Sequence, residues 1–122
     1  MKKILLIEDD MISSELVIDI LEMIGFKVKW AADGQEALAL LDKESFDLIL
    51  ADINLPKMNG IEFIQEIRKK PKSPAKYIVA MTANTTTKDG KSFQDIGFDG
   101  YIQKPFKLND FRAYISDLLG NE

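Results

Sequence analysis

Residues 46–52 read Phe-Asp-Leu-Ile-Leu-Ala-Asp, an apolar run that ends in a carboxylate. Residues 4–10 have a similar arrangement, Ile-Leu-Leu-Ile followed by Glu-Asp-Asp. Apolar runs of this kind are typical of strands that are buried on both faces, as in a parallel sheet covered by helices. The two runs therefore predict an α/β fold in which acidic residues stand where strands end.

Strand-like runs alternate with amphipathic segments along the whole chain, which predicts five strand and helix pairs. The expected strands are Lys3 to Glu8, Lys27 to Ala31, Phe46 to Asp52, Tyr77 to Thr82 and Gly100 to Gln103. The expected helices are Met11 to Ile24, Gly34 to Glu44, Gly60 to Lys70, Thr87 to Ile96 and Leu108 to Leu119. The second strand alternates lysine with apolar residues, so we expect it at an edge of the sheet.

The first expected helix shows the pattern most clearly. Leu16, Ile20 and Ile24 form an apolar stripe at helical spacing, and Gly25 follows as a stop signal. Asp10 stands just before the helix, where a carboxylate accepts hydrogen bonds from unpaired backbone N–H groups. We therefore read Asp10 as an N-cap rather than as a metal ligand.

Composition restricts the chemistry that the chain can perform. Its 122 residues are enough for one domain, which we expect to span residues 1–122, and they include no cysteine and no histidine. Disulfides, thiol nucleophiles and histidine-based triads or metal sites are thereby excluded within the chain. The net charge of −4 argues against a general nucleic-acid-binding face. No apolar run is long enough for a membrane anchor, so we expect a cytoplasmic protein.

Polar residues follow the expected strands at their carboxyl ends. In an open parallel sheet these ends meet at one rim, where ligands bind. The rim would gather Glu8, Asp9, Asp52, Thr82 and Lys104. Clustered carboxylates repel one another unless a cation is bound, and oxygen ligands favour a hard ion such as Mg²⁺. With Mg²⁺ and Lys104 balancing three carboxylates, an anionic phosphoryl group can enter, and Asp52 is the candidate nucleophile.

Several spaced motifs resemble one known family. Residues 4–9 resemble its first strand and acidic pair, and residues 52–60, Asp-Ile-Asn-Leu-Pro-Lys-Met-Asn-Gly, resemble its phosphoacceptor strand and loop. Thr82-Ala83 and Lys104-Pro105-Phe106 resemble its last two signatures. Together, in order, they make the chain similar to the receiver domain of bacterial two-component response regulators, in particular to single-domain, chemotaxis-like members. This resemblance implies a flavodoxin-like (βα)5 three-layer sandwich whose five parallel strands lie in the order 2-1-3-4-5.

The resemblance also implies a role for each matching position. Asp52 would accept the phosphoryl group, with Glu8, Asp9 and Asp52 as Mg²⁺ ligands alongside the backbone carbonyl of Asn54. Thr82 and Lys104 would contact phosphoryl oxygens. Tyr101 would act as a switch residue together with Thr82. The Lys104-Pro105 peptide bond would be cis. Asn54 and Asn84 would tune the lifetime of the phosphoryl group.

The implied function is that of a signalling switch rather than of a conventional enzyme. The chain would catalyse only its own phosphorylation and dephosphorylation, taking the phosphoryl group from a histidine kinase or a histidine phosphotransfer protein. The surface formed by the fourth helix, fifth strand and fifth helix would then bind a downstream protein or support onward relay. The alternatives are a receiver cut from a longer hybrid kinase or regulator and a phosphohydrolase with an aspartyl nucleophile. A flavodoxin-like cofactor binder is a further alternative, but the chain has neither glycine-rich phosphate-binding motif.

Overall fold

A computed structural model describes residues 2–53, 60–69, 75–83 and 93–120 of the protein. The sheet holds five parallel strands in the order β2-β1-β3-β4-β5, which confirms the expected fold and the edge position of β2. The strands are β1 Lys3–Ile7, β2 Lys27–Ala31, β3 Phe46–Asp52, β4 Ala75–Thr82 and β5 Gly100–Gln103. The helices are α1 Met11–Ile24, α2 Gly34–Leu41, α3 Gly60–Arg68, α4 Phe93–Ile96 and α5 Leu108–Leu119.

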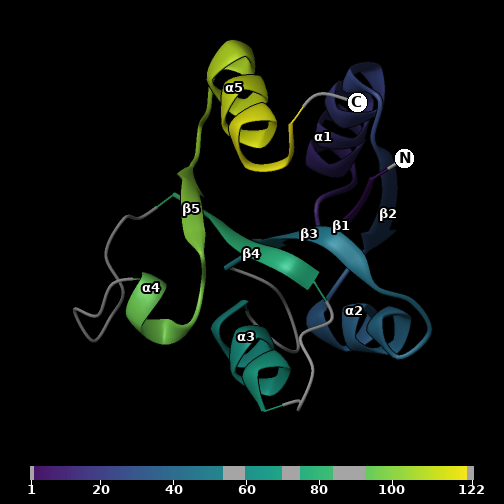
Figure 1. Ribbon diagram of the computed structural model, residues 1–122, viewed down its shortest axis with the longest axis vertical. Coiled ribbons are helices and arrows are strands. Elements are labelled where there is room, and N and C mark those ends of the chain that lie inside the picture. Colours follow the sequence, from purple (N-terminus) through teal and green to yellow (C-terminus); the bar gives the residue numbers. More distant parts are fainter. Residues whose placement is uncertain (1, 54–59, 70–74, 84–92, 121–122) are drawn as a thin grey trace.

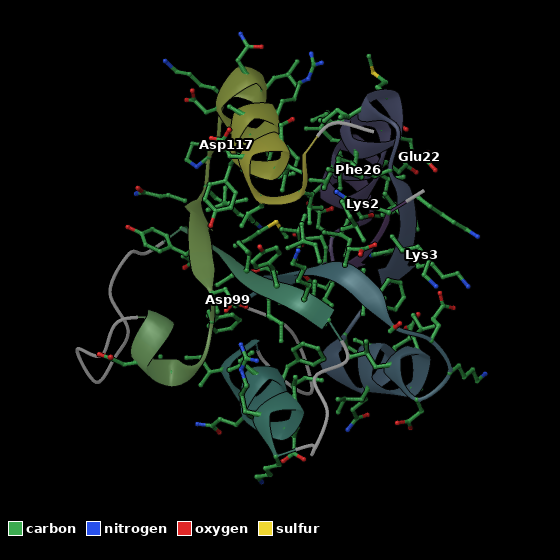
Figure 2. The ribbon with its side chains drawn as sticks, in the orientation of Figure 1. Lys2, Lys3, Glu22, Phe26, Asp99 and Asp117 are labelled. Carbon is green, nitrogen blue, oxygen red and sulfur yellow. The ribbon has the colours of Figure 1, made fainter. Side chains whose placement is uncertain are left out.

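Helices cover both faces of the sheet. Figure 1 shows α1 and α5 on one face and α2, α3 and α4 on the other. Successive residues of β1 point to opposite faces of the sheet. Leu5 and Ile7 pack in the core under α2 and α3, called the α2/α3 core, whereas Ile4 and Leu6 pack in the core under α1 and α5, called the α1/α5 core. All four side chains are fully buried, as expected for a strand with no solvent-facing side. Figure 2 shows the two layers of side chains that fill the spaces between sheet and helices.

The helix caps follow the sequence signals. The Asp10 carboxylate accepts a hydrogen bond from the backbone N–H of Ile12 at 3.1 Å, which agrees with its reading as the N-cap of α1. Asp33 caps α2 in the same way by accepting from the N–H of Glu36 at 2.9 Å. Gly25 ends α1 with a φ of 114°, a left-handed conformation that glycine adopts without steric cost. The Asp10 and Asp33 caps fix where the chain turns from strand to helix at the carboxyl ends of β1 and β2, and Gly25 fixes the turn from α1 back to β2.

The buried face of α1 differs from the expected stripe. Leu16 is 59% exposed, while Val17 and Leu21 are buried together with Ser14 and Ile20. The expectation for Leu16 was therefore wrong, because Val17 and Leu21 offer an equally regular stripe rotated by one residue, and the sheet and α5 select that one. The exposed Leu16 instead lines a cavity of about 360 Å³ beside Glu8 and Lys104.

Some element ends also differ from the expectation. β4 begins at Ala75 rather than Tyr77, because Ala75 pairs with Phe46 across the ladder to β3. β1 ends at Ile7, since its register with β2 ends at Ala31. α2 ends at Leu41, and a turn follows that includes Glu44. Residues 70 and 87–92 of the expected third and fourth helices lie outside the described part of the chain.

The amino-terminal edge of the sheet, opposite the functional rim, is tied together by ion pairs. Glu44 contacts Lys3 at 2.7 Å and Lys29 at 3.0 Å, which links β1 to β2. Asp99, labelled beside β5 in Figure 2, accepts from the backbone N–H of Ile78 at 2.7 Å and lies 3.5 Å from Arg68. None of the helices described here is long and apolar enough to cross a membrane.

Candidate functional site

The fold brings polar residues from four strands to one rim. Glu8 and Asp9 follow β1, Asp52 is the last residue of β3, Thr82 is the last residue of β4, and Lys104 follows β5. Because the strands are parallel, all of these residues leave the sheet at its carboxyl edge. Residues that are up to 96 positions apart in the sequence therefore meet within hydrogen-bonding distance.

Three carboxylates form the centre of the site. Glu8, Asp9 and Asp52 each present an oxygen atom, and these atoms all lie within 4.8 Å of one another. Glu8 is 3% exposed and Asp52 is 7% exposed, whereas Asp9 is open to solvent. Two buried carboxylates and one accessible one, with oxygen as the donor atom, suit a hard divalent cation that keeps part of its water shell. The donor set therefore fits Mg²⁺.

Lys104 contacts both of the buried carboxylates. Its Nζ lies 2.9 Å from Glu8 Oε2 and 3.0 Å from Asp52 Oδ2. The backbone N–H of Lys104 donates to the carbonyl of Thr82 at 2.7 Å, which fixes the start of the segment after β5. The peptide bond between Lys104 and Pro105 is cis. The ammonium group thus offsets part of the negative charge of the cluster.

Burial and charge shift the ionisation of these groups. Burial raises the pKa of Glu8, and the neighbouring negative charge of Asp52 raises it further, against the lowering effect of the hydrogen bond from Lys104. Burial lowers the pKa of Lys104, but hydrogen bonds to Glu8 and Asp52 outweigh that effect, so its pKa is raised overall. Because Lys104 stays positively charged between two buried carboxylates, it reduces the repulsion that a further anionic group would meet in the site.

Glu8 is held at three points besides its contact with Lys104. Its backbone N–H donates to the carbonyl of Ala31 at 3.1 Å, and its carboxylate Oε1 accepts from the backbone N–H of Asp10 at 3.2 Å. Its backbone carbonyl accepts a hydrogen bond from the indole Nε1 of Trp30 at 2.7 Å. Trp30 could not be identified from the sequence, because no spacing rule indicates that a tryptophan side chain reaches the end of the neighbouring strand.

The two expected switch residues differ in exposure. Thr82 is 3% exposed at the end of β4, while Tyr101 on β5 is 44% exposed. Tyr101 lines a cavity of about 330 Å³ on the α5 side together with Phe106, Phe111 and Tyr114. Asn54 and Asn84, the other two expected site residues, lie outside the described residues.

The sequence matches one protein family along most of its length. A family model described as "Response regulator receiver domain" matches residues 4–116. A curated relative, the transcriptional regulatory protein CpxR of Klebsiella pneumoniae, is 40% identical over 119 residues, which are 98% of this chain and 50% of the relative. The hybrid signal transduction histidine kinase K of Dictyostelium discoideum is 33% identical over 93% of this chain and 10% of its own length. The chain thus spans half the length of CpxR and a tenth of the kinase.

Solved structures agree with this match. The chemotaxis response regulator CheY4 of Vibrio cholerae superposes with a TM-score of 0.88 at 31% identity, covering 98% of this chain and 99% of that one. The receiver domain of the sensor histidine kinase PA1611 from Pseudomonas aeruginosa has a TM-score of 0.86 at 29% identity, covering 98% of both chains. That structure is described as having a magnesium ion coordinated in its active-site cleft.

Proposed function

Because the chain belongs to the receiver domain family of two-component response regulators, whose members are phosphoryl-accepting switches, we propose that Asp52 is its phosphoryl acceptor. One observation carries this assignment: the Asp52 carboxylate lies 3.0 Å from Lys104 Nζ and within the same 4.8 Å cluster as Glu8 and Asp9. A carboxylate at the end of a central strand, beside one cation and with oxygen ligands for another, is arranged to attack an anionic phosphoryl group.

In the proposed reaction an Asp52 oxygen attacks the phosphorus of a phosphohistidine supplied by another protein. The new O–P bond gives an acyl phosphate, and the P–N bond breaks and leaves its electron pair on the imidazole. Lys104 then exchanges its contact with the Asp52 carboxylate for a contact with a phosphoryl oxygen, and the Thr82 hydroxyl donates to another. Glu8, Asp9, Asp52 and the carbonyl of Asn54 would hold Mg²⁺, which when bound offsets the charge of the transferred group.

The protein is a signalling domain and not a conventional enzyme. We propose that its self-catalysed reactions are acceptance of the phosphoryl group and later hydrolysis of the acyl phosphate. The Asn54 and Asn84 side chains would govern the approach of water, so that Asn54→Lys lengthens the lifetime of the acyl phosphate. Thr82 and Tyr101 would carry the signal to the surface of α4, β5 and α5, where a downstream protein binds. We place these events in the cytoplasm.

A second observation supports the proposal that the donor is a protein. The first half of α1 borders the rim and exposes large apolar side chains, with Met11 at 61%, Ile12 at 79% and Leu16 at 59% exposure. Receiver domains interact with histidine kinases or phosphotransfer proteins, and this chain has no histidine of its own. A donor that reaches Asp52 would cover these side chains, and burial of such surface favours association.

The half-length match to CpxR bears on the setting of the domain. Receiver domains occur in the longer relatives as one part of a regulator or of a hybrid kinase, and the same is proposed here as an alternative to a self-contained switch. Both settings use the same site and the same chemistry. Only the destination of the signal differs between them.

The acceptor is tested with a small phosphodonor, which needs no partner protein. Wild type incubated with acetyl phosphate and Mg²⁺ should gain the mass of one phosphoryl group, and Asp52→Asn should gain none, because an amide lacks the anionic nucleophile. Glu44→Gln, which changes a carboxylate at the far edge of the sheet, is the matched control and should be labelled normally. Stoichiometric labelling of Asp52→Asn would show that another residue is the acceptor.

The donor surface is tested by separating the two kinds of phosphodonor. Ile12→Glu should slow transfer from a cognate histidine kinase while leaving the rate with acetyl phosphate unchanged, since the side chain lies outside the site. Met23 is the control, because it is 85% exposed on the same helix but near the opposite end from the rim. Met23→Glu should slow neither reaction. Equal effects of the two substitutions would argue against docking at the first half of α1.

A further inference from the structure

Trp30 contacts a metal-ligand candidate near the rim although it belongs to neither the acidic cluster nor the proposed reaction. It is the one tryptophan in the sequence. Its indole packs, half-buried, against the α1/α5 core on the edge strand β2, and its Nε1 donates to the backbone carbonyl of Glu8 at 2.7 Å. This is a contact between a side chain and the backbone of the residue that begins the acidic pair.

This hydrogen bond lies at the end of the backbone ladder between β1 and β2. β1 and β2 are paired up to Ile7 and Ala31, and the last rung beyond them is the bond from the Glu8 N–H to the Ala31 carbonyl. β2 ends at Ala31, so the ladder does not continue past Glu8. Trp30 faces the same side as its partner Leu6, and its long side chain reaches forward to the Glu8 carbonyl. The indole N–H therefore takes the position of the next rung.

We propose that Trp30 is a positioning residue that fixes the backbone of Glu8 and thereby the acidic pair that holds the metal ion. This inference rests on the proposed function, because it assigns Trp30 a role toward the same site. Trp30 holds the Glu8 backbone carbonyl, whereas Asp10 and Lys104 hold the Glu8 carboxylate. Loss of the indole bond frees the peptide between Glu8 and Asp9 to rotate.

Rotation of that peptide affects metal binding more than it affects the fold. Asp9 follows directly, and its carboxylate is the exposed member of the cluster, so its position depends on the backbone that carries it. Second-shell hydrogen bonds that orient metal ligands typically change metal affinity by about 10- to 100-fold. Trp30 acts through a backbone carbonyl rather than on a ligand atom, so we expect a smaller effect, a rise of about 3- to 10-fold in the Mg²⁺ dissociation constant.

The sharpest test removes the N–H and keeps the shape of the side chain. Because the sequence has one tryptophan, replacing tryptophan throughout the protein by benzothienylalanine, a bicyclic analogue with sulfur in place of the indole N–H, changes Trp30 alone. Trp30→Phe supplies a second variant that also lacks the donor. Val28→Ala is the control for packing, because Val28 lies on the same strand, packs against the same core and pairs with Ile4 rather than with the strand end at Glu8.

Two measurements separate positioning from packing. Calorimetry gives the Mg²⁺ dissociation constant, and urea unfolding in EDTA gives the stability of the metal-free protein. In both Trp30 variants the Mg²⁺ dissociation constant should rise by about 3- to 10-fold, whereas Val28→Ala should lose stability with unchanged Mg²⁺ affinity. With acetyl phosphate, the Trp30 variants should need more Mg²⁺ for half-maximal labelling and should reach the wild-type rate at saturation.

The outcomes also distinguish this inference from the proposed function. Unchanged Mg²⁺ affinity of the benzothienylalanine variant, with or without a loss of stability, would overturn the positioning role while leaving Asp52 as acceptor. Wild-type protein that binds no Mg²⁺ and gains no phosphoryl group would instead refute the proposed function itself. A lower labelling rate at saturating Mg²⁺ would also contradict the inference, because positioning of the metal ligands is compensated by excess metal.

Discussion

Gly100, the first residue of β5, lies against the side chain of Tyr114 on α5. A Cβ atom at Gly100 would stand 2.2 Å from the Tyr114 hydroxyl oxygen and 3.6 Å from the ring carbon that carries it. The first distance is a collision and the second is an ordinary contact. Gly100→Ala should therefore force Tyr114 out of its place, at a cost of about 1 to 3 kcal/mol in the free energy of unfolding.

Removal of the hydroxyl should remove the collision. Tyr114→Phe alone should change stability by no more than about 1 kcal/mol, because it deletes one polar group of a half-buried ring. In the double variant the new methyl group faces the ring carbon at contact distance, and alanine in a strand gains about 0.5 to 1 kcal/mol over glycine. The double variant should thus be at least as stable as Tyr114→Phe.

Urea unfolding of the four proteins gives this coupling energy directly. We expect the unfolding free energy of the double variant to exceed the value calculated by adding the two single effects by about 1 kcal/mol or more. Gly97→Ala is a control, since Gly97 has a φ of +132° and the cost there is backbone strain, which Tyr114→Phe should not relieve. Additive single effects within about 0.5 kcal/mol would refute the collision as the cause.

Three further changes test the electrostatics of the structure. Asp9→Asn should weaken Mg²⁺ binding by about tenfold or more. In EDTA its unfolding free energy should equal or exceed that of wild type, because repulsion within the cluster falls. Unchanged Mg²⁺ affinity would remove Asp9 from the site. Lys104→Met should lower the stability in EDTA by about 1 to 3 kcal/mol, because it removes the cation between two buried carboxylates, and added Mg²⁺ should restore part of the loss. Hydrogen bonds from Lys3 and Lys29 lower the pKa of Glu44 from 4.5, so its contribution is complete above that pH and is lost as the pH falls through the folded pKa. The stability difference between wild type and Glu44→Gln at neutral pH should accordingly vanish in acid, and a constant difference would contradict the pairing.

The sheet was predictable because its strands are buried on both faces. The run at residues 46–52 has the bounds of β3, and the polar residues after each run meet at one rim. Parallel pairing alone brings strand ends together, so the spatial cluster follows from the topology once the strands are recognised. The strand order itself came from the family resemblance, since hydrophobic pattern does not determine which strands are neighbours.

The details that could not be predicted depend on tertiary packing. Leu16 and Val17 are adjacent apolar residues, and only the position of α1 on the sheet decides that Val17 is buried and Leu16 is exposed. Trp30 belongs to none of the sequence motifs, and its hydrogen bond to Glu8 depends on the register of β1 and β2. The two-carboxylate contact of Lys104 likewise needs the geometry of the loop after β5. Sequence patterns indicate which segments are helices and strands, but where two apolar stripes compete they do not decide which one is buried, and they do not show which atom a side chain touches.

Lys104 links the chemistry of the rim to the surface on which the switch is proposed to act. Its ammonium group contacts Glu8 and Asp52. A metal ion on these carboxylates or a phosphoryl group on Asp52 competes for the same contacts, so either event changes the position that Lys104 prefers. Two residues later, the ring of Phe106 stacks on Phe111 of α5, with ring centroids 4.7 Å apart and planes 19° from parallel. A shift of Lys104 therefore acts on the segment that packs against α5, while α2 and α3 lie on the other face of the sheet. This asymmetry gives a physical reason for the proposed signal to emerge at β5 and α5 rather than at α2 and α3.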